Sequence, residues 1–419
     1  MPFEGAQKFE FYKCIGSPKL VVAPMVDQSE LAWRILCRRH GADLCYTPML
    51  HAQNFATDRK YRANNFHFEK RQDDRPLIGQ FCANDPGVLL SACELVLPHC
   101  DGIDLNLGCP QTVARHGHYG AYLQDEWELI HSMIRTLRMN LNVAVSCKVR
   151  IFDDVSRSID YAKMLESSGC QLLAVHGRTR EQKGINTGVA SWSHIRFIKE
   201  SVNIPVIANG NIQFYSDIDR CFQETGADAV MTAEGNLHNP YLFDNVQPPV
   251  WEPLFEYLDI VQDVPTPVSF VRGHLFKVLH HLLFCPDVRE QLAVAENLEQ
   301  FRHVVDEVRN RFVCMRLSMI DRSLQLLPFP HWICQPYVRP SSYNLVAESE
   351  QLEQMRRNFR ISQHEKIREL ASECGLSRKQ VKKLGRNPHA KLRQFSEISD
   401  CRCGNTKVSF LKEKRNENL

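Results

Sequence analysis

Eight short apolar segments recur through the first 245 residues, and this repeat is the feature that most constrains the fold. Each segment is rich in Val, Ile and Leu and is nearly continuous, as expected for strands that are buried on both faces of a parallel sheet. The predicted strands cover residues 19–26, 43–50, 76–82, 102–108, 143–150, 172–179, 205–212 and 229–236.

Segments with helical spacing separate these strands. Eight strand–helix units within about 245 residues match a (β/α)8 TIM barrel, which we predict over residues 15–246. A doubly wound open sheet is the alternative. Its dinucleotide-binding version carries Gly-x-Gly-x-x-Gly after the first strand, whereas Asp-Gln-Ser-Glu follows Val26 in this chain. The predicted helices cover residues 30–40, 86–97, 126–139, 157–168, 193–201 and 216–225.

Polar residues mark the ends of most of the predicted strands. In a barrel the carboxyl ends of all strands meet at one rim, where the active sites of this fold lie. One such residue alone fits a hydrogen-bonded group of the core, but a set at matching depths favours a convergent polar site. The strand ends carry Gln80, Asn106, Cys109, Lys148, Arg150, His176, Arg178, Asn209, Asn211 and Glu234.

One strand end has the sequence Asn106-Leu107-Gly108-Cys109-Pro110. Pro110 restricts Cys109 to extended geometry, and Gly108 permits a sharp bend or the close approach of a flat ligand. A buried cysteine before a loop proline is the alternative. The position at the mouth of a strand favours a thiol that exchanges a proton with a bound ring.

Two small turns follow the seventh and eighth strands, at residues 209–211 and 233–236. Backbone N–H groups in this position form the usual phosphate site of barrels, and we expect Glu234 to contribute its backbone rather than its carboxylate. Gln80 can pair with the polar edge of a flavin, and Lys148 can neutralise negative charge on a reduced ring, so the set favours FMN. An ion pair between Lys148 and a carboxylate that lines the barrel is the alternative.

Six segments share their order and spacing with one known family: Ala23-Pro24-Met25, Gln80, residues 106–110, Lys148-Val149-Arg150, His176-Gly177-Arg178-Thr179 and Asn209-Gly210-Asn211. Together they resemble the tRNA-dihydrouridine synthases over residues 15–245. Residues 105–127 and 234–240 are most similar to the eukaryotic branch that acts on positions 16 and 17 of the tRNA D-loop.

This resemblance implies reduction of uridine to 5,6-dihydrouridine in tRNA, with bound FMN as the hydride donor to C6 and NADPH as the transient electron donor. It implies Cys109 as the general acid that protonates C5, and Asn106, Arg150 and Arg178 as substrate-binding residues. The cofactor-binding residues that it implies are Pro24, Met25, Val26, Gln80, Lys148, His176, Asn209, Gly210, Asn211, Ala233 and Glu234.

The chain changes character after residue 250. Residues 268–283 and 290–321 have helical spacing, and we predict a small all-α domain over residues 252–346. The resemblance implies that this domain binds tRNA, whereas an ordinary solvated helix face is the alternative. Its candidate phosphate contacts are Arg302, His303, Arg309, Arg311, Arg316 and Arg322.

Residues 347–419 are strongly basic and poor in aromatic residues, which predicts a flexible tail that adds salt-sensitive RNA affinity. Cys401 and Cys403 resemble half of a zinc knuckle, but no second pair of ligands follows, so we expect no metal site. Lys382-Lys383 lies in a weak nuclear-signal pattern.

The 16 cysteines are scattered, which is typical of free thiols in a reducing compartment, and no apolar run reaches the length of a membrane span. We therefore expect a cytoplasmic monomer. Two other functions fit parts of the pattern: an FMN barrel that reduces a small pyrimidine, and a catalytically silent tRNA-binding relative. The first would not need the helical domain or the basic tail, and the second would not need Cys109 or the flavin contacts.

Overall fold

The computed structural model describes residues 9–68, 71–314, 327, 329–337, 368, 372 and 377 of the chain. The predicted tail therefore lies almost wholly outside the described residues, as do Arg316, Arg322, Lys382, Lys383, Cys401 and Cys403. Residues 1–338 form one compact unit. In the described part of the chain, no helix is long and apolar enough to cross a membrane. That part also contains no group of three or more His, Cys, Asp or Glu side chains arranged to hold a metal ion.

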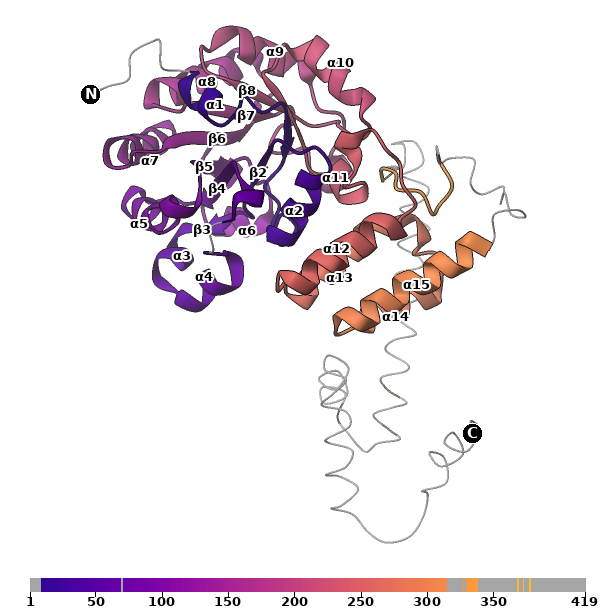
Figure 1. Ribbon diagram of the computed structural model, residues 1–419. Coiled ribbons are helices and arrows are strands. Elements are labelled where there is room, and N and C mark those ends of the chain that lie inside the picture. The colour runs from indigo at the N-terminus through magenta and orange to yellow at the C-terminus, as the bar shows by residue number, and fades with distance from the viewer. Residues whose placement is uncertain are drawn as a thin grey trace, which may run out of the picture. The chain divides into compact units, whose positions relative to one another are not determined.

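Parallel strands form a closed barrel at the centre of the unit (Figure 1). The order is β2-β1-β9-β8-β7-β6-β5-β4-β3, and a further pairing of β2 with β4 closes the ring. The TIM barrel predicted from the sequence is confirmed. The strands are β1 (Leu20–Val22), β2 (Leu44–Tyr46), β3 (Leu50–His51), β4 (Leu77–Cys82), β5 (Gly102–Leu107), β6 (Ala144–Arg150), β7 (Leu172–His176), β8 (Val206–Asn209) and β9 (Ala229–Thr232).

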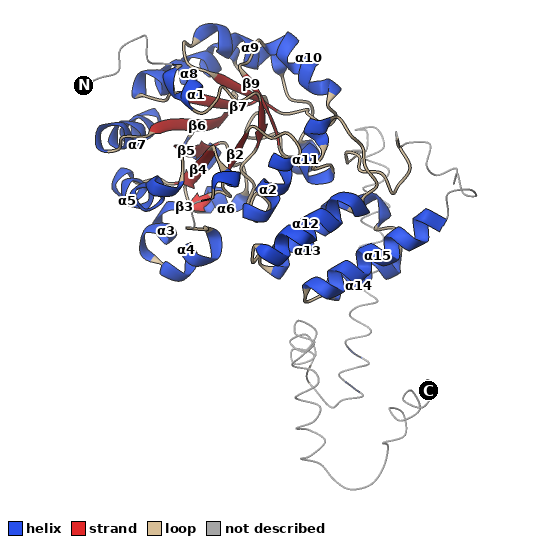
Figure 2. Ribbon diagram, in the orientation of Figure 1, coloured by secondary structure: helices blue, strands red, loops and turns tan. Residues whose placement is uncertain are grey.

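Helices surround the barrel and cover its outer face (Figure 2). Local signals fix several of their ends. Asp85 caps the helix that begins at Pro86, and Asp154 caps the helix that ends before Gly169 in the left-handed region. The helices from the start of the described chain to the end of the barrel are α1 (Glu10–Cys14), α2 (Leu31–Arg39), α3 (Ala52–Thr57), α4 (Arg59–Asn65), α5 (Pro86–Val96), α6 (Thr112–His116), α7 (Trp127–Asn140), α8 (Val155–Ser168), α9 (Trp192–Ser201), α10 (Ser216–Thr225) and α11 (Glu234–His238).

The sequence prediction was wrong about two strands. The segment 43–50 holds two short strands rather than one, because Pro48 has no N–H to donate to a ladder and interrupts it. The strand predicted over residues 229–236 ends at Thr232, and the rest of that segment turns into the short helix α11. After Thr232 the segment contains Glu234, Gly235 and Asn236, and these residues mark the turn from the strand into the helix rather than a continued strand.

Four further helices follow the barrel: α12 (Trp251–Asp263), α13 (Val268–Val278), α14 (Pro286–Val294) and α15 (Leu298–Cys314). The sequence analysis missed α12. It also treated residues 290–321 as one helical segment, whereas the structure breaks the helix between Val294 and Leu298, and residues 315–321 lie outside the described part.

The helices after the barrel pack against α2 and α11 (Figure 1). At this contact the ring of His274 stacks on Trp33 with 3.9 Å between centroids. His274 Nε2 lies 2.9 Å from a carboxylate oxygen of Glu30, and the Tyr257 hydroxyl donates to the other oxygen at 2.8 Å. All of these side chains are buried, so the contact depends on buried hydrogen bonds to Glu30 as well as on apolar packing.

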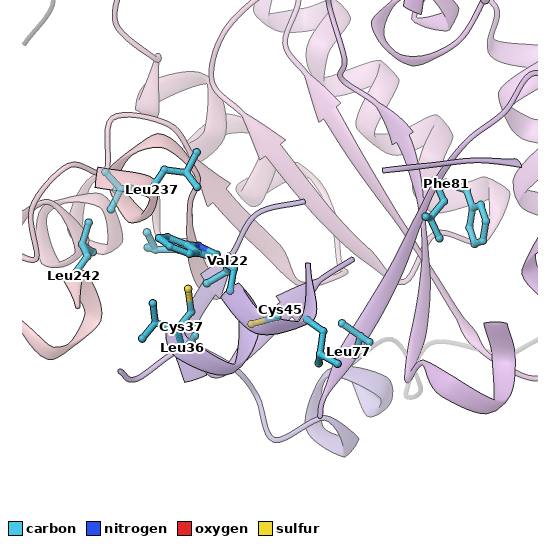
Figure 3. Packing of buried hydrophobic residues seen from close by; sticks show 14 of the residues in the cluster. Val22, Leu36, Cys37, Cys45, Leu77, Phe81, Leu237 and Leu242 are labelled. Carbon is cyan, nitrogen blue, oxygen red and sulfur yellow. The ribbon is translucent and has the colours of Figure 1, made fainter. Parts of the chain in front are cut away.

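Alternation along the strands divides the core into two parts. Outward-pointing residues pack against the helices, and Figure 3 shows Leu36 and Cys37 of α2 in this layer with Val22 and Cys45 of the barrel. Inward-pointing apolar residues fill the amino-terminal half of the barrel interior, where Tyr12 of α1 packs on them. The carboxyl-terminal half of the interior is polar, which leaves it for the site.

Candidate active site

Strand alternation directs the candidate residues into the barrel. Ile103 and Leu105 of β5 belong to the outer core, so Asp104 and Asn106 point inward. The register then places Asn106 opposite Lys148 of β6. One level further toward the carboxyl rim, Arg150 lies opposite His176, and His176 lies opposite Asn209. The predicted residues of β4 to β8 therefore converge on one rim.

A continuous hydrogen-bond chain runs from the Cys109 turn down into the barrel. The side-chain oxygen of Asn106 accepts from the backbone N–H of Cys109 at 2.9 Å and of Gly108 at 3.2 Å. Asn106 Nδ2 donates to Gln80 Oε1 at 2.9 Å, and Gln80 Nε2 donates to Asp104 at 2.8 Å. Because Gln80 is fully buried and both ends of its amide are engaged, it supports the site from below.

The turn that carries Cys109 is held from several sides. Cys109 is partly exposed, and its carbonyl accepts from Ala121 N–H at 3.0 Å. Gly120 has φ +67°, and a Cβ built on it would lie 2.8 Å from the Cys109 oxygen. Lys183 Nζ donates to the Pro110 carbonyl at 2.7 Å and to the Tyr122 hydroxyl at 3.0 Å. The thiol therefore sits on a fixed turn at the mouth of β5.

Lys148 reaches across the barrel from β6 to β8. Its Nζ donates to the side-chain oxygen of Asn209 at 3.0 Å, and Asn209 Nδ2 donates to the Met231 carbonyl at 2.9 Å. Burial, followed by the positive charge of Arg150, lowers the pKa of Lys148 to about 8. The opposite charge of Asp104 acts in the other direction, and burial raises the pKa of Asp104 itself to about 6.

Arg150 and Arg178 both hold loops at the rim. Arg150 donates to the carbonyls of Gly108 and Thr179 at 2.9 and 2.7 Å, and to that of Gln182 at 3.0 Å. Arg178 Nη2 donates to the Asn211 side-chain oxygen at 2.9 Å. Their guanidinium groups thus build the rim through backbone and amide oxygens.

His176 is neutral in this setting. Burial and the neighbouring charges of Lys148, Arg150 and Arg178 hold its pKa well below the usual range. Its unprotonated Nε2 accepts from Arg178 Nη1 at 2.9 Å. The imidazole therefore contributes no further positive charge and orients Arg178.

The two small turns form tight backbone corners beside this group. Gly210 has φ +115°, and a Cβ there would lie 2.6 Å from Ala190 Cβ and 3.1 Å from the His176 ring. At Gly235 a Cβ would lie 2.3 Å from the Ile212 carbonyl. Ala233 precedes the first residue of α11, and Glu234 begins this helix at a partly exposed position. Only glycine permits these close contacts at positions 210 and 235.

The first predicted segment lies at the rim as well. Pro24 and Met25 are partly buried directly after β1, and the Met25 N–H donates to Ser29 Oγ at 3.0 Å. Val26 is 56% exposed.

Three residues of the site were missed by the sequence analysis. Asp104 carried a usable signal, because it lies two residues before Asn106 on one strand and must share its face. Gly120 and Lys183 had no such signal, because their contacts with the Cys109 turn join segments that only the folded loops bring together.

The cations predicted to bind phosphates on the helices after the barrel have acidic neighbours. Arg302 pairs with Asp259 at 2.5 Å, Arg309 with Asp306 at 2.7 Å, and His303 with Glu307 at 3.2 Å. Arg311 pairs with Asp287. The described part of this surface is therefore charge-balanced, unlike the rim of the barrel.

Comparison with known proteins identifies the family. The family model described as dihydrouridine synthase matches residues 21–309, which is more than half of the chain. The chain belongs to the dihydrouridine synthase family. Its recognition from the sequence is thereby confirmed, and the protein is an enzyme of the oxidoreductase type.

Relatives named for different tRNA positions differ in their similarity to this family member. It is 51% identical over 389 residues to the mouse protein named tRNA-dihydrouridine(16/17) synthase [NAD(P)(+)]-like, covering 91% of this chain and 80% of that one. The Saccharomyces cerevisiae tRNA-dihydrouridine(16/17) synthase [NAD(P)(+)] is 44% identical, covering 79% and 86%. The mouse tRNA-dihydrouridine(20a/20b) synthase [NAD(P)+]-like protein is 39% identical, covering 62% and 80%.

Proposed function

We propose that this enzyme reduces uridine to 5,6-dihydrouridine at positions 16 and 17 of the tRNA D-loop, using FMN that NADPH recharges. The observation that carries the proposal is the convergence of the Cys109 thiol and the Lys148 ammonium group at one barrel rim. The side chain of Asn106 accepts a hydrogen bond from the backbone of Cys109, and Asn106 lies in register with Lys148 on the neighbouring strand. The names of the 16/17 relatives support the choice of positions.

The charges at the rim fit a cofactor that carries a phosphate and a ring that gains negative charge. Lys148, Arg150 and Arg178 face one another, and each opposes protonation of His176. Among the described residues, neither Lys148 nor Arg150 forms an ion pair: Lys148 donates to the Asn209 amide and Arg150 to backbone carbonyls. Asp104 below them carries an opposing charge. The excess of positive charge favours an anionic ligand.

We assign the cofactor contacts to residues around this charge. The glycine turns at 209–211 and 233–236 present backbone to a phosphate, and His176 holds Arg178 beside the first turn. Lys148 would balance charge on the ring, and Gln80 supports the floor. The remaining proposed contacts are Pro24, Met25, Val26, Asn209, Gly210, Asn211, Ala233 and Glu234.

Reduced FMN, when bound at this rim, supplies a hydride to C6 of the uracil ring. The electron pair of the C5=C6 bond then needs a proton at C5, and we assign that proton to the thiol of Cys109. The resulting thiolate lies at a partly exposed position and regains its proton from solvent. One hydride and one proton saturate the bond, so the reaction balances without a further group.

The substrate base must leave its stack to enter the rim, which costs a few kcal/mol at most in a folded loop. We assign its contacts to Asn106 and Arg150, which bond to the Cys109 turn, and to Arg178, which lies beside the turn at 209–211. Tyr119 is buried and meets His51 edge to face, and Phe81 is buried in the outer core, so both serve packing.

We further propose that residues 252–346 serve as a helical tRNA-binding domain and that residues 347–419 add non-specific RNA affinity. The rationale is the order of barrel and helices. Since the described cations on α15 are paired, we assign them a positioning role that is weak and salt-sensitive.

The test uses purified full-length protein, NADPH and unmodified tRNA, with dihydrouridine mapped by position. We expect product at positions 16 and 17. Cys109→Ala is expected to keep the flavin spectrum and to lose product formation by about 100-fold or more. Product from free uridine but not from tRNA would favour a small-pyrimidine reductase, and product at wild-type rate from Cys109→Ala would refute the acid assignment.

A further inference from the structure

Asp104 is the innermost residue of the hydrogen-bond chain that runs through Gln80 and Asn106 to the Cys109 turn. It is fully buried on β5, and its two oxygens accept from Gln80 Nε2 at 2.8 Å and from Ser146 Oγ at 2.6 Å. Neither bond reaches a position open to a ligand, so Asp104 acts through its neighbours.

The backbone N–H groups of the Cys109 turn fix the direction of every hydrogen bond in the series from Asn106 through Gln80 to Asp104. Two backbone N–H groups donate to Asn106 Oδ1, so the amide nitrogen of Asn106 must face Gln80. Gln80 then presents its oxygen to Asn106 and its nitrogen to the residue below. That residue must accept, and Asp104 does so while it also accepts from Ser146.

We propose that Asp104 is a positioning residue that, through Gln80, holds Asn106 in the one orientation that caps the Cys109 turn. Reversing any one amide in the chain would set two donors or two acceptors against each other in a buried place. Such a mismatch is destabilising, because a buried polar group that loses its partner has no water to replace it. The carboxylate therefore makes the orientation of the thiol-bearing turn a property of the barrel rather than of the loop.

The proposal predicts a specific rescue. Asn106→Asp keeps an acceptor for the Cys109 turn but presents a second acceptor to Gln80, so the Gln80 oxygen must face either the new carboxylate above it or Asp104 below it. When Asp104→Asn is combined with this change, the new amide nitrogen at position 104 donates to the oxygen of a flipped Gln80 amide. Its amide oxygen still accepts from Ser146. The double variant thus satisfies every group with the opposite polarity.

A matched control separates polarity from charge. Asp104→Leu combined with Asn106→Asp also removes the repulsion between two carboxylates, but it offers no donor to the reversed Gln80 oxygen. If only charge repulsion matters, Leu and Asn at position 104 rescue equally. If polarity matters, only Asn rescues.

The experiment measures dihydrouridine formation in tRNA and, in flavin-free protein, the rate at which iodoacetamide alkylates Cys109, mapped by mass spectrometry. We expect Asn106→Asp to reduce product formation about 10- to 100-fold and to change the alkylation rate, and Asp104→Asn to recover at least about tenfold of the product rate. The Leu pair should stay at the level of Asn106→Asp.

Equal recovery with Leu and Asn, or no recovery with Asn, would overturn the proposal. The product readout depends on the proposed function, whereas the alkylation readout does not. If wild-type protein forms no dihydrouridine but alkylation follows the rescue pattern, the function fails and the role of Asp104 stands. If wild-type protein is active and neither readout shows rescue, the role of Asp104 fails and the function stands.

Discussion

The side-chain oxygen of Asn106 lies 2.9 Å from the backbone nitrogen of Cys109 and accepts its hydrogen bond. Asn106 is the last inward-pointing residue of β5, so this bond ties the thiol-bearing turn to the barrel wall. In a loop without such a bond the thiol would sample many positions. Restricting it to the reactive position would then cost conformational entropy at the moment of reaction.

Removing this bond should therefore impair chemistry more than cofactor binding. We expect Asn106→Ala to retain flavin and to lower the rate of dihydrouridine formation about 10- to 100-fold, because the turn loses its cap. Asn84→Ala is the control, since the Asn84 amide donates to a backbone oxygen at 3.2 Å on an exposed loop. Its rate should stay within about twofold of wild type. Equal losses in both variants would contradict the role of Asn106.

Gly120 and Gly226 offer a second matched pair. Both have positive φ, at +67° and +63°, so alanine introduces comparable backbone strain of about 1 kcal/mol at either site. A Cβ at Gly120 meets the backbone of Cys109 at 2.8 Å, whereas one at Gly226 has open space within 4 Å. We expect both variants to lower the unfolding temperature, but only Gly120→Ala to lower product formation, by about tenfold or more. Similar rates in the two variants would show that the Gly120 contact does not position the thiol.

The buried charge of Lys148 should lower the free energy of unfolding of the protein. Its pKa falls from 10.5 to about 8, so the unfolded chain binds a proton between these values that the folded chain has lost. Stability therefore rises as pH increases from about 8 to 10.5, and the cost of the buried charge is fully present below about pH 8. Lys148→Met should raise the unfolding free energy of the flavin-free protein by about 1–2 kcal/mol at pH 7 and end product formation.

Denaturant unfolding at pH 7 and pH 10 tests this sign. The gain from Lys148→Met should shrink at the higher pH, because wild-type Lys148 is then neutral in the folded state. A gain that is independent of pH would mean that packing rather than charge burial explains it.

Glu30, unlike Lys148, is expected to stabilise the protein in its charged form, at the contact between the barrel and the later helices. Although burial acts against it, His274 holds the pKa of Glu30 below its ordinary value of 4.5. The stabilisation by the ionised Glu30 carboxylate is therefore fully present above pH 4.5, and it is lost as pH falls through the lower pKa of Glu30 in the folded state. We expect Glu30→Gln to cost about 2–3 kcal/mol at pH 7, and this difference from wild type to vanish on acidification.

The control for Glu30 is Glu200→Gln, since Glu200 lies 3.9 Å from Arg196 in an exposed pair. That change should alter the unfolding free energy by less than about 0.5 kcal/mol. A cost for Glu30→Gln that persists undiminished in acid would argue against stabilisation by the ionised Glu30 carboxylate.

Much of the fold could be predicted because buried parallel strands have a continuous apolar pattern. Each predicted strand segment contains an observed strand, and Gly and Pro residues separate several of them. The prediction failed at two boundaries: the strand predicted over residues 229–236 ends at Thr232 before α11, and a segment with one helical pattern is divided into α14 and α15. Periodicity reports burial, and the chain direction at a buried corner is decided by packing.

The sequence by itself determined which residues reach the rim. Parallel strands end on the same side of a barrel, so Asn106, Lys148, His176 and Asn209 had to converge once the strands were recognised. What the tertiary structure alone decided is how these groups are held. Gly120 against Cys109, Lys183 on Pro110 and Glu30 with His274, 244 positions along the chain, are contacts between distant segments. Hydrogen bonds and charges act over a few ångströms in space, and a linear sequence does not record which distant segments come that close.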